Sequence, residues 1–166
     1  MLEPTTRLPF VNADVIADER WPDAQLEHAY DASRAAAALR EQLLAEHRSF
    51  LTETVFSHPS KLELLRTARR LGYLVNLHVM LVPEDLTVAR VEHRVARGGH
   101  AVPEEKIRER YSRLWPLVAQ ARDLADLTSV YDNSRAAEPF RLVATYERGV
   151  QVGDTHYPVW TPPAVI

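Results

Sequence analysis

The sequence predicts an α/β fold in which a parallel sheet is flanked by helices. Short apolar runs alternate with longer segments whose apolar residues recur at helical spacing, and this alternation is typical of βαβ units. With 166 residues, 46% of them hydrophobic and 26% charged, the chain also has the size and composition of one soluble domain. We therefore expect residues 1–166 to form a single domain, with an α/β core over 8–134 and a hairpin and arm over 135–166.

Four short apolar runs are predicted to form the strands of the core. They are Phe10–Ala13, Ser49–Thr52, Leu74–Val82 and Ser129–Tyr131. The third is nearly continuous Leu, Val and Met, which is typical of a strand covered on both faces. Farther along, Leu142–Glu147 and Val150–Trp160 are predicted to be extended on either side of Gly149, so we expect a C-terminal β-hairpin.

The segments between the strands carry helix start and stop signals. A first helix is predicted over about Ala24–Glu46. The stretch Ser60–Glu63 resembles a capping box, and Gly72 supplies the stop of that helix. Another helix is expected from Pro83 to Gly98, and one more begins at Pro103.

Composition excludes several classes of function. The absence of Cys excludes a thiol nucleophile, a thiolate zinc site and a disulfide framework, so the cytoplasm is the expected compartment. A formal net charge of -3 argues against general binding to nucleic acid. No apolar run approaches the roughly 20 residues of a membrane span, and the seven His residues show no metal-ligand spacing. We expect no membrane, nucleic-acid or metal site.

Acidic side chains follow the first two predicted strands. Ligands gather beyond the carboxyl ends of the strands in an open parallel sheet, and Asp14 and Glu53 stand at two such ends. Two carboxylates in one crevice suit a general base and a group that holds a metal or a substrate hydroxyl. The alternative is that both residues merely cap the helices that follow them.

Three arginines form a stripe on the helix that ends at Gly98. Arg90, Arg94 and Arg97 are spaced i, i+4 and i+7, and like charges so arranged repel unless an anion neutralises them. A phosphate matches the planar guanidinium fork. The alternative is a solvated helix face. Arg108 and Arg110 lie about 200° apart on the next helix, so only one of the two is expected to join the stripe.

The phosphate-binding loop of the GxxxxGK[ST] type is absent. The chain has two lysines, Lys61 and Lys106, and neither follows a glycine. The usual cradle for the β and γ phosphates of a nucleotide is therefore missing from these 166 residues.

Five segments, in order and spacing, resemble the zeta-toxin-like P-loop kinases over about residues 8–145. They are Phe10–Asp14, Phe50–Thr54, Gly72–Tyr73, Arg90–Pro103 and Tyr131–Ser134. The resemblance implies a nucleoside-kinase-like parallel sheet that uses ATP and Mg²⁺. It also implies transfer of the γ-phosphoryl group to a hydroxyl of a UDP-linked amino sugar, and a toxin–antitoxin setting in which an antitoxin is a partner.

The resemblance also implies roles for single residues. Asp14 is expected to take the hydroxyl proton, and Arg90, Arg94 and Arg97 to neutralise the phosphates. The expected contacts to the acceptor substrate come from Asn12, Glu53 and Thr54. Asn133 is expected to contact the nucleotide by the same resemblance. Two further nucleotide contacts are expected from position in the sequence: Arg108 beside the arginine stripe, and His100 next to Gly98 and Gly99, where the alternative is a simple turn residue.

The chain starts where the second strand of this family is expected, so the first strand and the P-loop are predicted to be missing. Three explanations are open: a start codon assigned too late, a remnant without catalysis, or a first strand supplied by another polypeptide. Loss of a central strand leaves unpaired edges, which favour self-association. We expect slow phosphoryl transfer by the chain as given, and the alternative is a non-catalytic protein that binds a partner.

Overall fold

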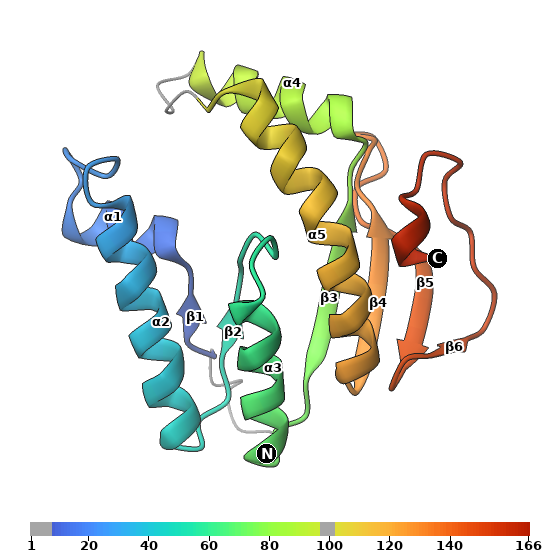
Figure 1. Ribbon diagram of the computed structural model, residues 1–166, viewed down its shortest axis with the longest axis horizontal. Coiled ribbons are helices and arrows are strands. Elements are labelled where there is room, and N and C mark those ends of the chain that lie inside the picture. The colour runs from blue at the N-terminus through green and yellow to red at the C-terminus, as the bar shows by residue number, and fades with distance from the viewer. Residues whose placement is uncertain (1–7, 97–101) are drawn as a thin grey trace, which may run out of the picture. The chain divides into compact units, whose positions relative to one another are not determined.

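A computed structural model of the protein describes residues 8–96 and 102–166. The chain divides into two compact units, Met1–Val55 and Phe56–Ile166, and each has its own apolar cluster. Mixed α/β structure is present, as predicted, with helices against sheets in both units (Figure 1). That residues 1–166 act as a single domain stays a prediction. None of the described helices has the length and apolar character needed to cross a bilayer.

The first unit is built on a pair of short parallel strands. Strand β1, Phe10–Val11, pairs with β2, Leu51–Thr52, and Val11 lies opposite Thr52. Two helices, α1 (Ala13–Arg20) and α2 (Ala29–Ala45), connect the strands (Figure 1). The buried side chains between these elements are small or aliphatic: Val11, Ile16, Ala17, Ala32, Ala36 and Leu43.

Helix α1 was not expected from the sequence. Ala13, predicted to end the first strand, is instead the first residue of this helix. The cause is Asn12, whose backbone is extended and whose Oδ1 accepts hydrogen bonds from the N–H groups of Asp14 (2.7 Å) and Val15 (3.4 Å). Asparagine is among the preferred N-cap residues because it satisfies these free donors. The helix predicted from Ala24 begins later, at Ala29.

The second unit is built on a four-stranded mixed sheet with the strand order β3-β4-β5-β6. Its strands are β3 (Asn76–Leu81), β4 (Leu127–Asp132), β5 (Arg141–Glu147) and β6 (Val150–Val152). The β3–β4 pair is parallel, as predicted, while β4–β5 and β5–β6 are antiparallel. The C-terminal hairpin is confirmed, and Gly149 takes a positive φ of 79° in its turn.

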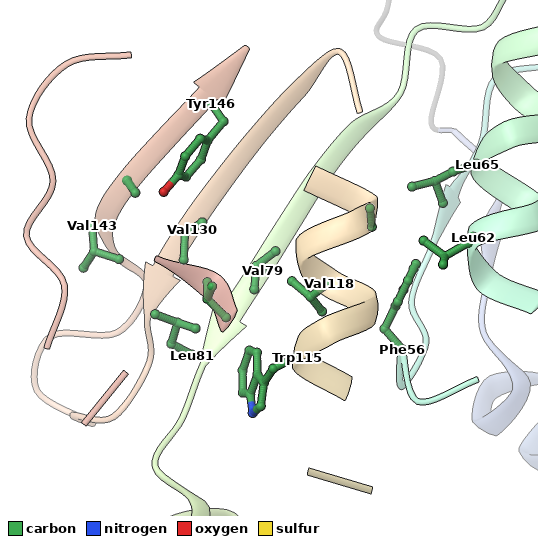
Figure 2. Packing of buried hydrophobic residues seen from close by; sticks show 13 residues of the cluster. Phe56, Leu62, Leu65, Val79, Leu81, Trp115, Val118, Val130, Val143 and Tyr146 are labelled. Carbon is green, nitrogen blue, oxygen red and sulfur yellow. The ribbon is translucent and has the colours of Figure 1, made fainter. Parts of the chain in front are cut away.

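The core of the second unit lies between this sheet and helix α5. The helices are α3 (Ser60–Arg70), α4 (Glu84–Val95) and α5 (Glu104–Leu124), followed by the short η1 (Pro163–Val165). Figure 2 shows Trp115 and Val118 of α5 against Val79 and Leu81 of β3. Helices α4 and α5 form the crossover that joins the two parallel strands.

Strand β3 is covered on one face, which corrects the expectation of a strand buried on both. Val79 and Leu81 are buried, whereas Asn76, His78 and Met80 are exposed. Helix α5 packs against the buried face, and the apolar run therefore reflects one covered side only. His78 contacts the hydroxyl of Tyr131 on the neighbouring strand at 3.4 Å.

Two further expectations about element ends are wrong. The predicted capping box does not form, because Pro59 is the N-cap of α3 and the Ser60 hydroxyl contacts His58 Nδ1 at 3.0 Å; the N–H of Ser60 donates to the same nitrogen at 3.2 Å. The last strand ends at Val152 rather than Trp160, and the next residue, Gly153, has a positive φ of 75° that breaks the extended run. The stop at Gly72 is confirmed by its φ of 83°.

Candidate functional site

The side chain of Asn12 links the carboxyl ends of β1 and β2. Its Nδ2 donates a hydrogen bond to Glu53 Oε2 at 3.1 Å, while its Oδ1 caps α1. The backbone N–H of Glu53 donates to the carbonyl of Val11 at 3.3 Å, which continues the parallel pairing for one more residue. Asp14, in the first turn of α1, is therefore brought to the same end of the strand pair as Glu53.

These contacts argue against the idea that Asp14 and Glu53 are only helix caps. Asn12 caps α1, and the next helix after Glu53 begins at Ser60. Both carboxylates are exposed, and neither forms an ion pair with any residue in 8–96 or 102–166. Thr54 is also exposed, and its hydroxyl donates weakly to the carbonyl of Val55 at 3.4 Å. An exposed carboxylate without a cationic partner can accept a hydrogen bond or a proton from a hydroxyl.

A buried arginine lies beneath this end of the strands and was missed by the sequence analysis. Arg40 is 7% exposed, and its guanidinium donates to Thr52 Oγ1 at 3.3 Å. The signal was present in the sequence, since position 40 continues the spacing of the buried residues Ala32 and Ala36 along α2. Position 40 was thus predictable as a core-facing site occupied by a charged residue.

The residues predicted to contact phosphates lie in the second unit. Arg90 of α4 donates to the backbone carbonyl of Asn133, 2.9 Å away, and so ties the helix to the end of β4. Arg94 is exposed and makes no ion pair within the described part of the chain. Arg97 and His100 fall outside the described residues.

Arg108 is engaged by three carboxylates. Its guanidinium lies 2.8 Å from Glu104, 2.9 Å from Asp85 and 3.6 Å from Glu84. Hydrogen bonds to Glu104 and then Asp85 raise the pKa of Arg108 above its ordinary value. These contacts connect the first turns of α4 and α5, and the predicted role of Arg108 toward a nucleotide stays a prediction.

Asp132 at the end of β4 is the most buried carboxylate described near these residues. It accepts hydrogen bonds from the Arg141 guanidinium and from the N–H of Ser134, both at 2.9 Å. Burial alone would raise the pKa of Asp132, but the hydrogen bonds from Ser134 and Arg141 outweigh burial and hold this pKa below its ordinary value. Asp132 therefore stabilises the fold in its charged form.

We expect a pH dependence of stability from Asp132. Because its folded pKa lies below the unfolded value of about 3.9, its contribution is complete above about pH 4 and is lost as the pH falls through the folded pKa. Between pH 6 and pH 3, the unfolding free energy of Asp132→Asn should therefore fall less than that of the wild type in urea titrations. The exposed Asp154→Asn variant is the control and should match the wild type. Equal losses in all three proteins would contradict this role.

In 8–96 and 102–166, no three His, Asp or Glu side chains gather in a way that could hold a metal ion. The described residues therefore contain no cluster of three or more metal ligands. Kinase sites hold Mg²⁺ with one or two carboxylates together with the phosphates of the nucleotide.

Comparisons with known proteins agree with the resemblance seen in the sequence. A family model described as "Zeta toxin" matches residues 11–141, which include Asn12, Asp14 and Glu53 as well as Arg90 and Asn133. An uncharacterized protein of Haemophilus influenzae is 28% identical over 102 residues, which are 61% of this chain and 73% of that protein. The mixed α/β structure with its parallel strand pairs is compatible with a P-loop kinase-like fold. Because the family match spans most of its length, the chain belongs to the Zeta toxin family.

Proposed function

We propose that the chain carries the acceptor side of a zeta-toxin-type phosphotransferase. The reaction is transfer of the γ-phosphoryl group of ATP to a hydroxyl of a small UDP-linked amino sugar. The observation that supports this most is the Asn12 side chain, which caps α1 and holds Glu53 at the carboxyl end of the β1–β2 pair. Ligands of open parallel sheets bind at such ends.

Each acceptor-side residue has a role that its chemistry supports. Asp14 takes the proton that the acceptor hydroxyl loses when its oxygen bonds to phosphorus. Glu53 accepts a hydrogen bond from another hydroxyl of the same molecule, and Thr54 and Asn12 complete the polar surroundings. Both carboxylates are exposed and without cationic partners in the described residues, so they are available for these contacts.

On the nucleotide side, we assign phosphate neutralisation to Arg90, Arg94 and Arg97, and nucleotide contacts to His100, Arg108 and Asn133. Arg90 and Arg94 are exposed, and guanidinium groups fit the phosphates of ATP. ATP would supply the transferred group and would bind together with Mg²⁺. A Gly-Lys pair does not occur in the 166 residues. We therefore propose that this chain by itself binds Mg-ATP weakly and transfers phosphate slowly.

Two titrations and one transfer assay test the proposal. Calorimetry should show binding of a UDP-linked amino sugar and only weak binding of Mg-ATP. In long incubations with radiolabelled ATP, Asp14→Asn should lower transfer to the sugar by about 10²-fold or more, because a positioned general base contributes this much. Asp18→Asn, another exposed change on α1, is the control. Tight Mg-ATP binding, or transfer unchanged in Asp14→Asn, would contradict the proposal.

A second candidate function is partner binding without catalysis, and the free edge of β3 favours it. Among the described residues, β3 pairs with β4 alone, so its other edge presents unpaired backbone groups. Self-association or binding of an antitoxin protein would satisfy them. A mass in solution that does not rise with concentration would count against self-association.

A further inference from the structure

Arg40 is a buried cation whose one described hydrogen-bond acceptor is neutral. Its side chain projects from α2 toward the end of β2, where the guanidinium contacts Thr52 Oγ1 at 3.3 Å. The Thr52 hydroxyl donates its own proton to the carbonyl of Val11 at 2.8 Å, so the hydroxyl acts as an acceptor toward Arg40. The three groups form a short chain from α2 through β2 to β1.

No carboxylate forms an ion pair or a hydrogen bond with Arg40 within residues 8–96 and 102–166. No ion pair involves Arg40, and the nearby acid Glu53 is held by the Asn12 amide instead. Glu41 follows Arg40 on the helix, and from its exposed position it favours the charged form of Arg40 without a hydrogen bond to it. Burial lowers the pKa of Arg40 and outweighs the opposite effect of Glu41.

An uncompensated buried charge costs several kcal/mol, and an apolar residue would fill the same space at lower cost. The guanidinium also has further N–H donors beyond the one that Thr52 receives. Thr52 is partly exposed, and the exposed Glu53 follows it directly. The buried charge therefore lies next to Thr52, a partly exposed residue at the end of β2.

We propose that Arg40 is the base of an anion-binding site that opens at Thr52 and receives a phosphate group of a small molecule. The planar fork of arginine suits phosphate oxygens, and a phosphate supplies the direct anionic partner that Arg40 lacks among the described residues. Glu53 would repel an anion placed directly beside it, so the anionic part of the ligand lies toward Arg40 and a hydroxyl-bearing part lies toward Glu53. The orientation toward Glu53 rests on the proposed function, whereas anion binding at Arg40 does not require phosphoryl transfer.

Inorganic pyrophosphate is the probe for this site, and binding is followed by NMR of the arginine Nε–Hε groups in the intact chain. The Arg40 signal is assigned by its absence from the spectrum of Arg40→Lys. We expect pyrophosphate, and not NaCl at equal ionic strength, to shift this signal in a saturable way. The affinity for pyrophosphate should fall about 10-fold or more in Arg40→Met, the range for a charged hydrogen bond.

Arg34→Met is the matched control, because Arg34 is an exposed arginine of the same helix that pairs with Asp31. Its pyrophosphate affinity should equal that of the wild type. If Arg40→Met does not fold, Arg40→Lys replaces it and should bind pyrophosphate more weakly than the wild type. The proposal is overturned if pyrophosphate leaves the Arg40 signal of the wild type unmoved, or if the affinity is the same in the wild type and in the folded Arg40 variant. Because neither ATP nor a sugar is present, these results are independent of the phosphotransferase proposal.

Discussion

Trp115→Ala is expected to destabilise the unit Phe56–Ile166 by about 3–5 kcal/mol, the range for truncation of a large core aromatic. Trp115 is 5% exposed and packs with Val79, Leu81 and Val118 in the main apolar cluster (Figure 2). Its ring also makes an edge-to-face contact with Tyr111, with 5.2 Å between the ring centroids. Truncation removes these contacts and leaves a cavity between α5 and the sheet.

Urea unfolding followed by circular dichroism measures this effect. Trp115→Phe keeps an aromatic ring in the core and should cost much less than the alanine variant. Leu74→Ala is a second control, since Leu74 is 79% exposed and a surface truncation of this kind changes stability by about 0.5 kcal/mol or less. A loss below about 1 kcal/mol for Trp115→Ala would mean that α5 does not form the core of this unit.

Glu53→Gln is expected to weaken binding of a UDP-linked amino sugar by roughly 10-fold or more. A hydrogen bond between a charged carboxylate and a hydroxyl contributes about 1.5–3 kcal/mol, and the amide replaces it with a weaker neutral one. The substitution is nearly isosteric, and its carbonyl oxygen can still accept the hydrogen bond that Asn12 Nδ2 gives to Glu53. The local fold is therefore retained, and the loss reports on the missing charge.

Glu19→Gln controls for the change in net charge, because Glu19 is an exposed residue of α1. Calorimetric titration of the three proteins with the same sugar nucleotide compares their dissociation constants directly. Equal affinities in the wild type and Glu53→Gln would remove Glu53 from the proposed acceptor site. A loss of the same size in Glu19→Gln would point to a general effect of charge.

Apolar patterning predicted the strands well because burial decides where they form. The apolar run that begins at Phe10 contains β1, and the run that begins at Leu74 contains β3. Both parallel pairings follow from the alternation of strands and helices. The sequence did carry a signal that β3 is covered on one face, because Asn76 and His78 are two residues apart and therefore share the strand face that is exposed. Helix α1 was missed because its start depends on the Asn12 cap, a contact made by one side chain.

The candidate site was predicted in part, through the residues that follow the strands. Placement of Asp14 and Glu53 at one end of the β1–β2 pair agrees with the rule for parallel sheets. The hydrogen bond from Asn12 to Glu53 could not be predicted, because it depends on the side-chain conformation of Asn12 and apolar periodicity does not report side-chain conformations. Arg108 of α5 forms ion pairs with Asp85 and Glu84 of α4. Because these residues lie on different helices, helical spacing could not predict the pairs.

A crystal structure of the protein with a UDP-linked amino sugar tests the acceptor site most directly. The account predicts a sugar hydroxyl within about 3 Å of a carboxylate oxygen of Asp14 and a second hydroxyl at the same distance from Glu53. A sugar nucleotide bound elsewhere, with both carboxylates facing only water, would contradict it.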